Sequence, residues 1–336
     1  MKKKIKAALI GFGGMGHHHA SEYAAQKDVE LVAICDIDKK RLSESSAAIN
    51  IGASGKIDLS KLRKFLCYED MVKALPDLDY LDICLPTPLH CQYAIRAMKD
   101  GMNVLCEKPM ALNLRDCRKM IEVQKKTGKI LMIAQCLRFS EEYETIRQAF
   151  VSQKYGKLLR LDMRRNANTP PNWFRDGKQS GGAILDLHLH DLDFIISLLG
   201  KPQSLTAYGV KGVSGDYDDS IAFYHYGKKG PIVSAEGSWM RAKFCAGAVA
   251  IFEKATLELN SDGLTLRQID KPVTPIKTRG KGARGKMYFN EIAYFAACVK
   301  AGKQPERALP SSTCDSVAMV EAERESIRKR KTVKVK

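Results

Sequence analysis

The chain has 336 residues, enough for about two domains, and 45% of them are hydrophobic while 28% are charged, a balance typical of globular proteins and not of disordered chains. Lysine and arginine number 55 against 38 acidic residues, a formal net charge of +17. Such a surplus can attract nucleic acid, but the sequence carries no zinc-finger, RRM or KH signature, so we predict no nucleic-acid partner. Attraction of an anionic substrate or of a cofactor's phosphates is the alternative use of this charge.

The first residues, Met1–Lys4 and then the apolar run Ile5–Ile10, resemble the start of a signal peptide. That run is short for a signal peptide, and a glycine-rich loop follows it in place of a cleavage site, so we predict a first strand and a cytoplasmic protein. No apolar stretch is long enough to span a membrane, and we predict no membrane partner. Ten cysteines form no Cys-x-x-Cys pair, and several lie in apolar strands (Cys35, Cys84 and Cys106). This distribution of the cysteines predicts that they are reduced residues of the core, and that they form neither disulfides nor a metal site.

The first part of the chain alternates short apolar runs with segments of helical periodicity. In chain order, beginning with a strand, predicted strands alternate with predicted helices at Ile5–Ile10, Gly16–Gln26, Val29–Cys35, Lys39–Ile49, Tyr80–Leu85, Pro88–Lys99, Asn103–Cys106, Leu114–Lys126 and Ile130–Ala134. Pro88 suits the first position of its helix, with Thr87 as the N-cap. Alternation of this kind predicts an α/β domain over 1–134, with a doubly wound parallel sheet between layers of helices.

The pattern changes after the last of these strands. A helix near Glu141–Val151 precedes consecutive strands, which we expect at Leu158–Arg164, Ser204–Val210, Ser220–Tyr226, Ile232–Trp239, Ala248–Phe252 and Thr256–Asn260. Consecutive strands without helices between them indicate an antiparallel sheet, so residues 135–336 are predicted to form an α+β domain. Lys277–Lys286 is predicted to be a flexible loop. Two helices follow, near Tyr288–Lys300 and Ser311–Ile327.

A glycine-rich loop lies between the first predicted strand and the first helix, and it fits the pattern G-x-G-x-x-G. Glycines there permit a tight turn and close approach of a pyrophosphate, while the helix N-terminus offers free N–H groups and a positive dipole end. Asp36 follows the last glycine by 20 residues, at the end of the second strand, where a carboxylate meets the adenosine ribose hydroxyls. A glycine turn without a ligand is the alternative. The loop consists of Gly11, Phe12, Gly13, Gly14, Met15 and Gly16.

Three histidines in a row, His17 to His19, open the first helix. Consecutive helical residues point in different directions, so these side chains are not expected to converge on one metal ion.

Two proline-containing segments also come just after predicted strands, Pro86-Thr87-Pro88 and Glu107-Lys108-Pro109. Ligands of open α/β sheets bind at the carboxyl ends of the strands, so Pro86, Thr87, Glu107 and Lys108 are expected beside the cofactor. Lys108 is then expected near its reactive end. For this lysine the alternative is an ordinary surface position in a turn.

A third pattern lies in the helix predicted from Leu185 to Leu199, where leucines and isoleucines form an apolar stripe. Asp186, His190 and Asp193 form a second stripe on the predicted helix, displaced by one residue from the apolar stripe. The first two are spaced i, i+4, so their side chains can touch. A histidine beside a carboxylate can act as a base with a fixed tautomer. The alternative is a helix cap with a structural histidine. A zinc site is not expected, because partner ligands at familiar spacing are lacking.

Taken in this order, these motifs resemble the glucose–fructose oxidoreductase / inositol dehydrogenase (Gfo/Idh/MocA) family over nearly the whole chain. The Glu-Lys-Pro and Asp-x-x-x-His elements are far more specific than the glycine loop. The segments that carry the resemblance are Ala8–Gly13 with His19, Pro86–His90, Glu107–Ala111, Arg138-Phe139, the region of Trp173, Gly181-Gly182, Asp186 with His190 and Asp193, and Glu321–Ser326.

The resemblance implies a Rossmann domain followed by a domain with an open, largely antiparallel sheet, and dimers or tetramers that often pair these sheets. It implies that Lys108 contacts both substrate and nicotinamide, that His190 is the acid/base, and that Asp186 orients it and holds a substrate hydroxyl. His90 would join the cofactor contacts. The candidate substrate-binding residues are Arg138, Trp173, Arg175, Asp186 and His190.

The sequence therefore predicts an NAD(P)-dependent oxidoreductase that moves hydride between a nicotinamide cofactor and a secondary alcohol of a sugar, inositol or related polyol. Asp36 favours NAD, whereas the basic run Lys39–Arg41 leaves room for NADP. Two alternatives stay open on this fold. One is a nucleotide-responsive regulator without catalysis, which need not retain Lys108 or the Asp186–His190 pair. The other is an NAD-dependent glycosidase.

Overall fold

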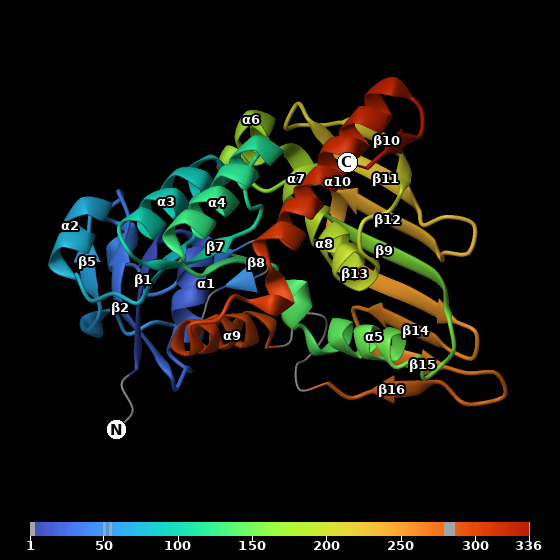
Figure 1. Cartoon of the computed structure of the whole chain (residues 1–336), viewed down its shortest axis with the longest axis horizontal. Coiled ribbons are helices and arrows are strands. Elements are labelled where there is room, and N and C mark those ends of the chain that lie inside the picture. Colours follow the sequence, from blue (N-terminus) through green and yellow to red (C-terminus); the bar gives the residue numbers. More distant parts are fainter. Residues whose placement is uncertain (1–3, 50–51, 54–55, 279–285, 336) are drawn as a thin grey trace. The chain divides into compact units, whose positions relative to one another are not determined.

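The computed structural model describes residues 4–49, 52–53, 56–278 and 286–335 (Figure 1). The chain forms two compact units, Met1–Gln135 with Tyr288–Ser311, and Cys136–Met287 with Ser312–Lys336. Most of the predicted loop Lys277–Lys286 lies outside the described residues.

A six-stranded sheet forms the centre of the first unit, in the order β5-β2-β1-β6-β7-β8. Every neighbouring pair is parallel, so the predicted doubly wound sheet is confirmed. The strands are β1 (Ile5–Ile10), β2 (Val29–Cys35), β5 (Arg63–Phe65), β6 (Tyr80–Ile83), β7 (Asn103–Glu107) and β8 (Leu131–Ala134). The order turns back between β1 and β6, and such a switch point is where open α/β sheets bind their ligands.

In the first unit, local sequence explains both ends of helix α4. In α4, the Asn113 side chain caps the first turn by accepting from the Asp116 N–H at 3.0 Å, and Gly128 ends the helix with a φ of 67°. Such caps satisfy backbone groups that a helix leaves open at its ends. The helices are α1 (Gly14–Tyr23), α2 (Tyr68–Ala74), α3 (Thr87–Lys99), α4 (Leu114–Thr127) and α9 (Met287–Ala301).

Two local predictions are wrong. The segment Lys39–Ile49 is not an α-helix: it contains a 3-10 turn, η1 (Arg41–Ser43), and a short strand, β3 (Ala48–Ile49), paired with β4 (Gly52–Ala53). Its serines favour turns over helices because their hydroxyls bond nearby backbone, as Ser43 Oγ does with the Lys40 carbonyl at 2.6 Å. Helix α3 begins at Thr87, so Thr87 is not its N-cap.

Helix α9 belongs to the first unit, although the sequence predicts one uninterrupted second domain over 135–336. The Phe295 ring packs edge-on against Tyr80 of β6, with the ring centroids 4.9 Å apart. Gln26 donates to the Phe289 carbonyl at 2.9 Å, and Lys300 pairs with Asp28 at 3.0 Å. The chain therefore returns to cover the first sheet before it completes the second unit.

The second unit contains a nine-stranded sheet in the order β16-β15-β14-β13-β9-β12-β11-β10-β17. All pairs are antiparallel except β9 with β12, so the predicted largely antiparallel sheet is confirmed. The strands are β9 (Leu158–Asn168), β10 (Ser204–Lys211), β11 (Tyr217–His225), β12 (Ile232–Ser238), β13 (Met240–Phe252), β14 (Thr256–Asn260), β15 (Gly263–Arg267), β16 (Thr274–Ile276) and β17 (Val333–Lys334).

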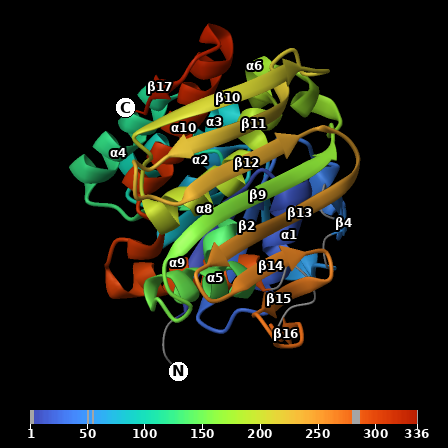
Figure 2. The same ribbon diagram turned by 90° about the vertical axis from the view of Figure 1, so that its right-hand side faces the viewer.

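Helices cover one face of this sheet and leave the other open (Figure 2). Alternation along β11 shows the two faces: Ala222 and Tyr224 are buried, whereas Ile221 and Phe223 are exposed. Among the described residues, no helix has both the length and the apolar character needed to cross a membrane. The helices of this unit are α5 (Glu141–Val151), α6 (Gly177–Ser180), α7 (Gly182–Asp186), α8 (Leu189–Leu199) and α10 (Pro310–Lys329), with the 3-10 turns η3 (Cys136–Phe139) and η4 (Asn172–Arg175).

Candidate active site

Two glycines of the loop after β1 are required by the packing of the protein itself. Gly11 has a φ of +92°, and a Cβ there would lie 2.6 Å from the Cys84 carbonyl oxygen, just beyond β6. A Cβ at Gly16 would lie 2.1 Å from the Gly11 carbonyl oxygen. Neither position has room for a side chain, so β1, β6 and α1 pack closely because these residues are glycines.

Gly13 has different surroundings. It precedes α1 as its N-cap and, having no side chain, makes no capping bond. The nearest atom to a Cβ built there is Arg41 Nη1, at 3.7 Å. Gly14 and Met15 form the first turn of α1 beside it. Space over a helix N-terminus that the described protein does not fill is what a pyrophosphate requires.

Asp36, at the end of β2, is tied to the same loop. One carboxylate oxygen, Oδ2, accepts the Phe12 N–H at 2.7 Å, and Oδ1 accepts the Asp38 N–H at 2.8 Å. Each carboxylate oxygen has a second lone pair, which leaves capacity for a ribose hydroxyl. Arg41 Nη1 lies 3.6 Å from Oδ2. The Phe12 side chain is buried, so this residue offers a ligand only its backbone.

His90, predicted as a cofactor contact, joins two segments of the protein, and its contact with the cofactor stays a prediction. Its Nδ1 lies 2.7 Å from the Pro109 carbonyl oxygen and its Nε2 lies 2.7 Å from that of Leu85. Burial lowers the pKa of His90, and the two carbonyls oppose this shift. Because each ring nitrogen faces a backbone carbonyl of a different segment, His90 links the segments after β6 and β7. Of its neighbours, Pro86 occupies the N-cap position of α3 without a side-chain capping bond, and Thr87 is buried.

Lys108 follows β7 directly and is half-buried. Its backbone N–H donates to Glu107 Oε2 at 3.1 Å, and Oε1 of the same carboxylate lies 2.9 Å from His19 Nε2. Burial raises the pKa of Glu107, but His19 and Lys108 outweigh it and lower the pKa below its usual range. The backbone N–H of Lys108 therefore donates to an ionised carboxylate, that of Glu107.

In the second unit, Asp186 ends α7 and His190 lies in the first turn of α8. The sequence predicts one helix through both, and this is wrong. The N–H groups of Leu187 and His188 both donate to the Ala183 carbonyl, at 3.0 and 2.9 Å, so the second bond spans five residues. This wider turn separates α7 from α8, and the simple i, i+4 relation no longer applies.

His190 has a neighbour that the sequence does not predict. Its Nδ1 lies 3.9 Å from Cys136 Sγ, in the turn η3. Cys136 is 54 positions away in the chain, and a single cysteine in an apolar segment carries no signal of such proximity. The two side chains meet only because α8 packs on η3.

Arg138 and Asp193 form a buried ion pair. The guanidinium donates through Nε and Nη2 to the two carboxylate oxygens, both at 2.7 Å. Ser316 donates to the same carboxylate at 2.9 Å, and Arg138 also bonds Ser312. The pair fastens α8 to η3, which gives Arg138 a structural role, and the predicted substrate contact stays a prediction.

The other candidate substrate residues lie in η4. Trp173 stacks on Phe174 with the ring centroids 4.0 Å apart, and Phe174 meets the buried Trp239 edge-on at 6.1 Å. Arg175 is exposed. The structure thus brings both tryptophans of the chain into one aromatic cluster.

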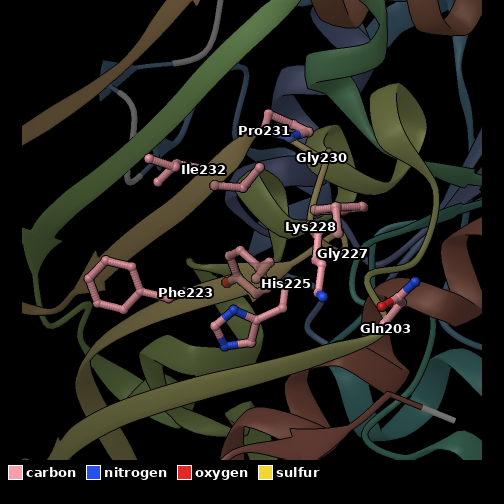
Figure 3. Close-up of a pocket in the computed structure, with 11 residues that line it drawn as sticks. Gln203, Phe223, His225, Gly227, Lys228, Gly230, Pro231 and Ile232 are labelled. Atoms are coloured by element: carbon pink, nitrogen blue, oxygen red, sulfur yellow. The ribbon is translucent and has the colours of Figure 1, made fainter.

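A surface hollow of about 620 Å³ lies in the hairpin between β11 and β12 (Figure 3). Phe223, His225, Lys228 and Ile232 are among its lining residues. None of the predicted site residues lines it, so we do not assign it to the reaction.

Residues 5–135 match the oxidoreductase family with an NAD-binding Rossmann fold, Gfo/Idh/MocA, and residues 143–258 match the C-terminal domain of the same family. The chain belongs to the Gfo/Idh/MocA family. As a member it is an NAD-binding oxidoreductase, and the predicted family and cofactor are confirmed. The open space at Gly13 and the carboxylate of Asp36 fit that cofactor.

Two curated family members align over nearly the full length. The chain is 27% identical over 322 residues to the myo-inositol 2-dehydrogenase of Thermotoga maritima, covering 90% of each protein. It is 26% identical over 321 residues to the scyllo-inositol 2-dehydrogenase (NAD(+)) of Bacillus subtilis, covering 91% of this chain and 89% of that one.

Among solved structures, levoglucosan dehydrogenase in complex with NADH superposes with a TM-score of 0.84 at 18% identity. The superposition covers 99% of this chain and 100% of that chain. The two proteins share the Gfo/Idh/MocA fold.

Proposed function

We propose that the chain oxidises a secondary alcohol of a sugar, inositol or related polyol, with NAD as the preferred cofactor, or catalyses the reverse reduction. The observation that carries this proposal is the placement of Lys108. It follows β7 at the carboxyl edge of the parallel sheet, above a buried carboxylate that bonds its backbone. The names of the aligned relatives, two of them inositol dehydrogenases, support the polyol class.

NAD, when bound, supplies the hydride acceptor. The pyrophosphate would lie over Gly13 at the N-terminus of α1, and Asp36 would accept from the ribose hydroxyls. As the C–H bond of the alcohol breaks, the imidazole of His190 takes the hydroxyl proton and the C=O bond forms. The Lys108 ammonium stabilises the developing alkoxide. Asp186 orients the histidine and holds a substrate hydroxyl.

A positioned proton-transfer group supplies about 10²–10⁴-fold in rate. The rest of the acceleration must come from alignment of the alcohol with the cofactor and from the charge of Lys108. A resident metal has no part in this scheme.

The test is a panel of sugars and polyols with NAD and with NADP, read by the absorbance of reduced cofactor. On the best substrate, we expect Lys108→Met to bind NAD normally and lose about 10²–10³-fold in kcat, because the alkoxide loses its cation. We expect His190→Ala to lose about 10²–10⁴-fold and to lose the pH-dependent step of the histidine. The double variant should cost less than the product of the two losses, since both residues act on one transition state.

Lys99→Met serves as the matched control, because Lys99 is an exposed lysine in α3. Near-normal turnover and pH profile in His190→Ala would make His190 structural. An aryl-glycoside assay runs beside the panel. Hydrolysis without net formation of NADH would indicate a glycosidase, and NAD binding without either activity would indicate a regulator.

We also propose that the chain is a cytoplasmic homodimer or homotetramer that associates through the open face of the nine-stranded sheet. Exposed apolar side chains lie on three neighbouring strands of that face: Tyr208, Ile221, Phe223 and Ile232. Contiguous exposed apolar surface of this kind marks an interaction site.

A further inference from the structure

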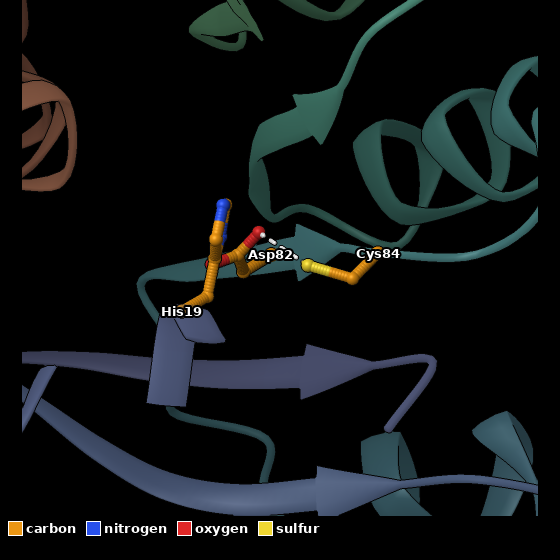
Figure 4. A group of neighbouring side chains, drawn as sticks. All are labelled: His19, Asp82 and Cys84. Carbon is orange, nitrogen blue, oxygen red and sulfur yellow. Dashed lines mark hydrogen bonds and ion pairs between the residues drawn. The ribbon is translucent and has the colours of Figure 1, made fainter. Parts of the chain in front are cut away.

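A buried hydrogen-bond network lies below Lys108, and the proposed reaction does not use it directly. His19 of α1 is at its centre, with no exposed surface. Its Nδ1 lies 2.9 Å from Asp82 Oδ2 on β6, and its Nε2 lies 2.9 Å from Glu107 Oε1 on β7. Figure 4 shows the side of this network that faces Asp82 and Cys84. One histidine therefore bridges the carboxylates of two neighbouring strands.

The two partners of His19 determine its charge. A carboxylate can only accept hydrogen bonds, so both ring nitrogens must donate, and only the imidazolium does so. Burial lowers the pKa of His19, but the hydrogen-bonded Asp82 carboxylate opposes it, and the pKa lies well above the usual range. On the core side, Tyr23 donates to the same Asp82 oxygen at 2.8 Å. His19 is therefore held as a cation between two anions.

The same residues could be taken for a metal site. The ligand atoms of His19, Asp82 and Cys84 lie within 4.8 Å of one another. However, the His19–Asp82 contact is a direct hydrogen bond, and the Cys84 thiol donates to the other Asp82 oxygen at 3.6 Å. Burial raises the pKa of the Cys84 thiol, which keeps its proton. Protons already join these three side chains, and a metal would have to replace them.

Glu107 connects the network to Lys108. It uses Oε1 for His19 and Oε2 for the Lys108 backbone N–H. On the other side of the same turn, His90 bonds the Pro109 carbonyl. The turn that carries Lys108 is thus held from one side by a charged histidine and from the other by His90.

We propose that His19 is a positioning residue that acts through Glu107 to hold Lys108 where the alkoxide develops. This inference rests on the proposed function, which assigns Lys108 to the reaction. Without His19 the Glu107 carboxylate loses its charged partner and can turn away from the Lys108 N–H. The ammonium then stabilises the transition state less well, because preorganisation of charge is what makes such a group effective.

The test compares two substitutions that each keep one of the two hydrogen bonds. The glutamine amide of His19→Gln reaches the position of Nε2 and keeps a donor toward Glu107. The asparagine amide of His19→Asn reaches the position of Nδ1 and keeps a donor toward Asp82. We expect kcat within about 3-fold of wild type for Gln and a loss of about 10–10²-fold for Asn, since a small misplacement can cost that much. The Kd for NAD should be unchanged in both.

His18→Asn is the matched control: His18 is the neighbouring residue of the same helix, and its ring packs edge-on against Tyr288. This variant should keep wild-type kcat. Equal kcat losses for His19→Gln and His19→Asn would overturn the proposal. They would show that the hydrogen bond to Glu107, which only glutamine keeps, has no special effect on turnover. If His19→Asn does not fold, Glu107→Gln replaces it, and unchanged kcat in that variant would also overturn the proposal.

A double variant separates this proposal from the one on which it rests. In the Lys108→Met background, His19→Asn should cause no further loss of kcat, because its effect passes through the lysine. The same loss in both backgrounds would make His19 merely structural. Wild-type activity in Lys108→Met would refute the proposed function itself. A stoichiometric transition metal in the purified protein would overturn the assignment of the network to protons.

Discussion

Gly13 is the residue of the glycine loop whose substitution separates ligand binding from folding. A side chain at Gly13 meets only the flexible end of Arg41, at 3.7 Å, whereas one at Gly11 meets backbone at 2.6 Å. We therefore expect Gly13→Val to fold with a Tm near wild type and to lose NAD binding, because the valine occupies the pyrophosphate space. NADH fluorescence titration and a thermal melt measure the two quantities.

Gly11→Ala is the matched comparison, since its Cβ clashes with the Cys84 carbonyl and its φ is positive. This variant should unfold at a clearly lower temperature. Undiminished NAD affinity in Gly13→Val would show that the loop is only a turn.

Asp36 and Arg41 together bear on the choice between NAD and NADP. The carboxylate repels a 2′-phosphate, whereas Arg41, 3.6 Å away and half-exposed, offers a charge that could bind it. We expect the wild type to bind NAD more tightly than NADP. The difference between the two affinities should be smaller in Asp36→Ala, and NADP should bind more weakly to Arg41→Ala than to the wild type. Titration of each variant with both nucleotides tests this. Equal affinity of the wild type for NAD and NADP would contradict the prediction.

At the scale of elements, the attachment of α8 to η3 depends on one buried ion pair. Asp193 has no exposed surface and Arg138 is 7% exposed. Removing one partner leaves an uncompensated buried charge, so Asp193→Ala should lower the free energy of unfolding by about 3–5 kcal/mol. Urea denaturation measures the loss. The double variant Arg138→Met with Asp193→Leu should recover much of it, and a failure to do so would assign the pair a role beyond charge compensation.

The same attachment carries the candidate base. His190 lies in the first turn of α8, three residues before Asp193, and Cys136 of η3 approaches its imidazole. In the Asp-x-x-x-His-x-x-Asp motif, Asp186 and His190 are the residues that we propose for the reaction, whereas Asp193 attaches the helix to η3 through Arg138. The sequence predicts α8 but not its separation from α7, and only packing shows that Asp193 pairs with Arg138.

At the scale of the whole molecule, the open face of the nine-stranded sheet predicts the assembly. Phe223 is 42% exposed and Ile232 is 61% exposed. Burying such side chains against a second copy is favourable by about 25 cal/mol per Å² of apolar surface. We expect an oligomer in light scattering, and a monomer for Phe223→Asp with Ile232→Asp. A monomeric wild type at micromolar concentration would refute this interface.

Local pattern determined much of this protein. The bounds of β1, β2, α5 and β14 agree with the sequence prediction residue for residue, because apolar periodicity and turn residues are signals contained within each segment. The sequence likewise predicts that the glycine loop, Asp36 and the Glu-Lys-Pro turn follow strands of a parallel sheet, as observed. Alternation of strands and helices indicates such a sheet, whose ligands bind at the carboxyl ends of the strands.

Only the tertiary structure decided what connects these segments. His19 meets Asp82 and Glu107 across 63 and 88 positions of sequence, and α9 returns to the first unit after the strands of the second. The wide turn between α7 and α8 and the buried pairing of Arg138 arise in the same way. Such contacts depend on which faces of distant elements are buried together. The spacing of residues within one segment does not predict which distant segment packs against it.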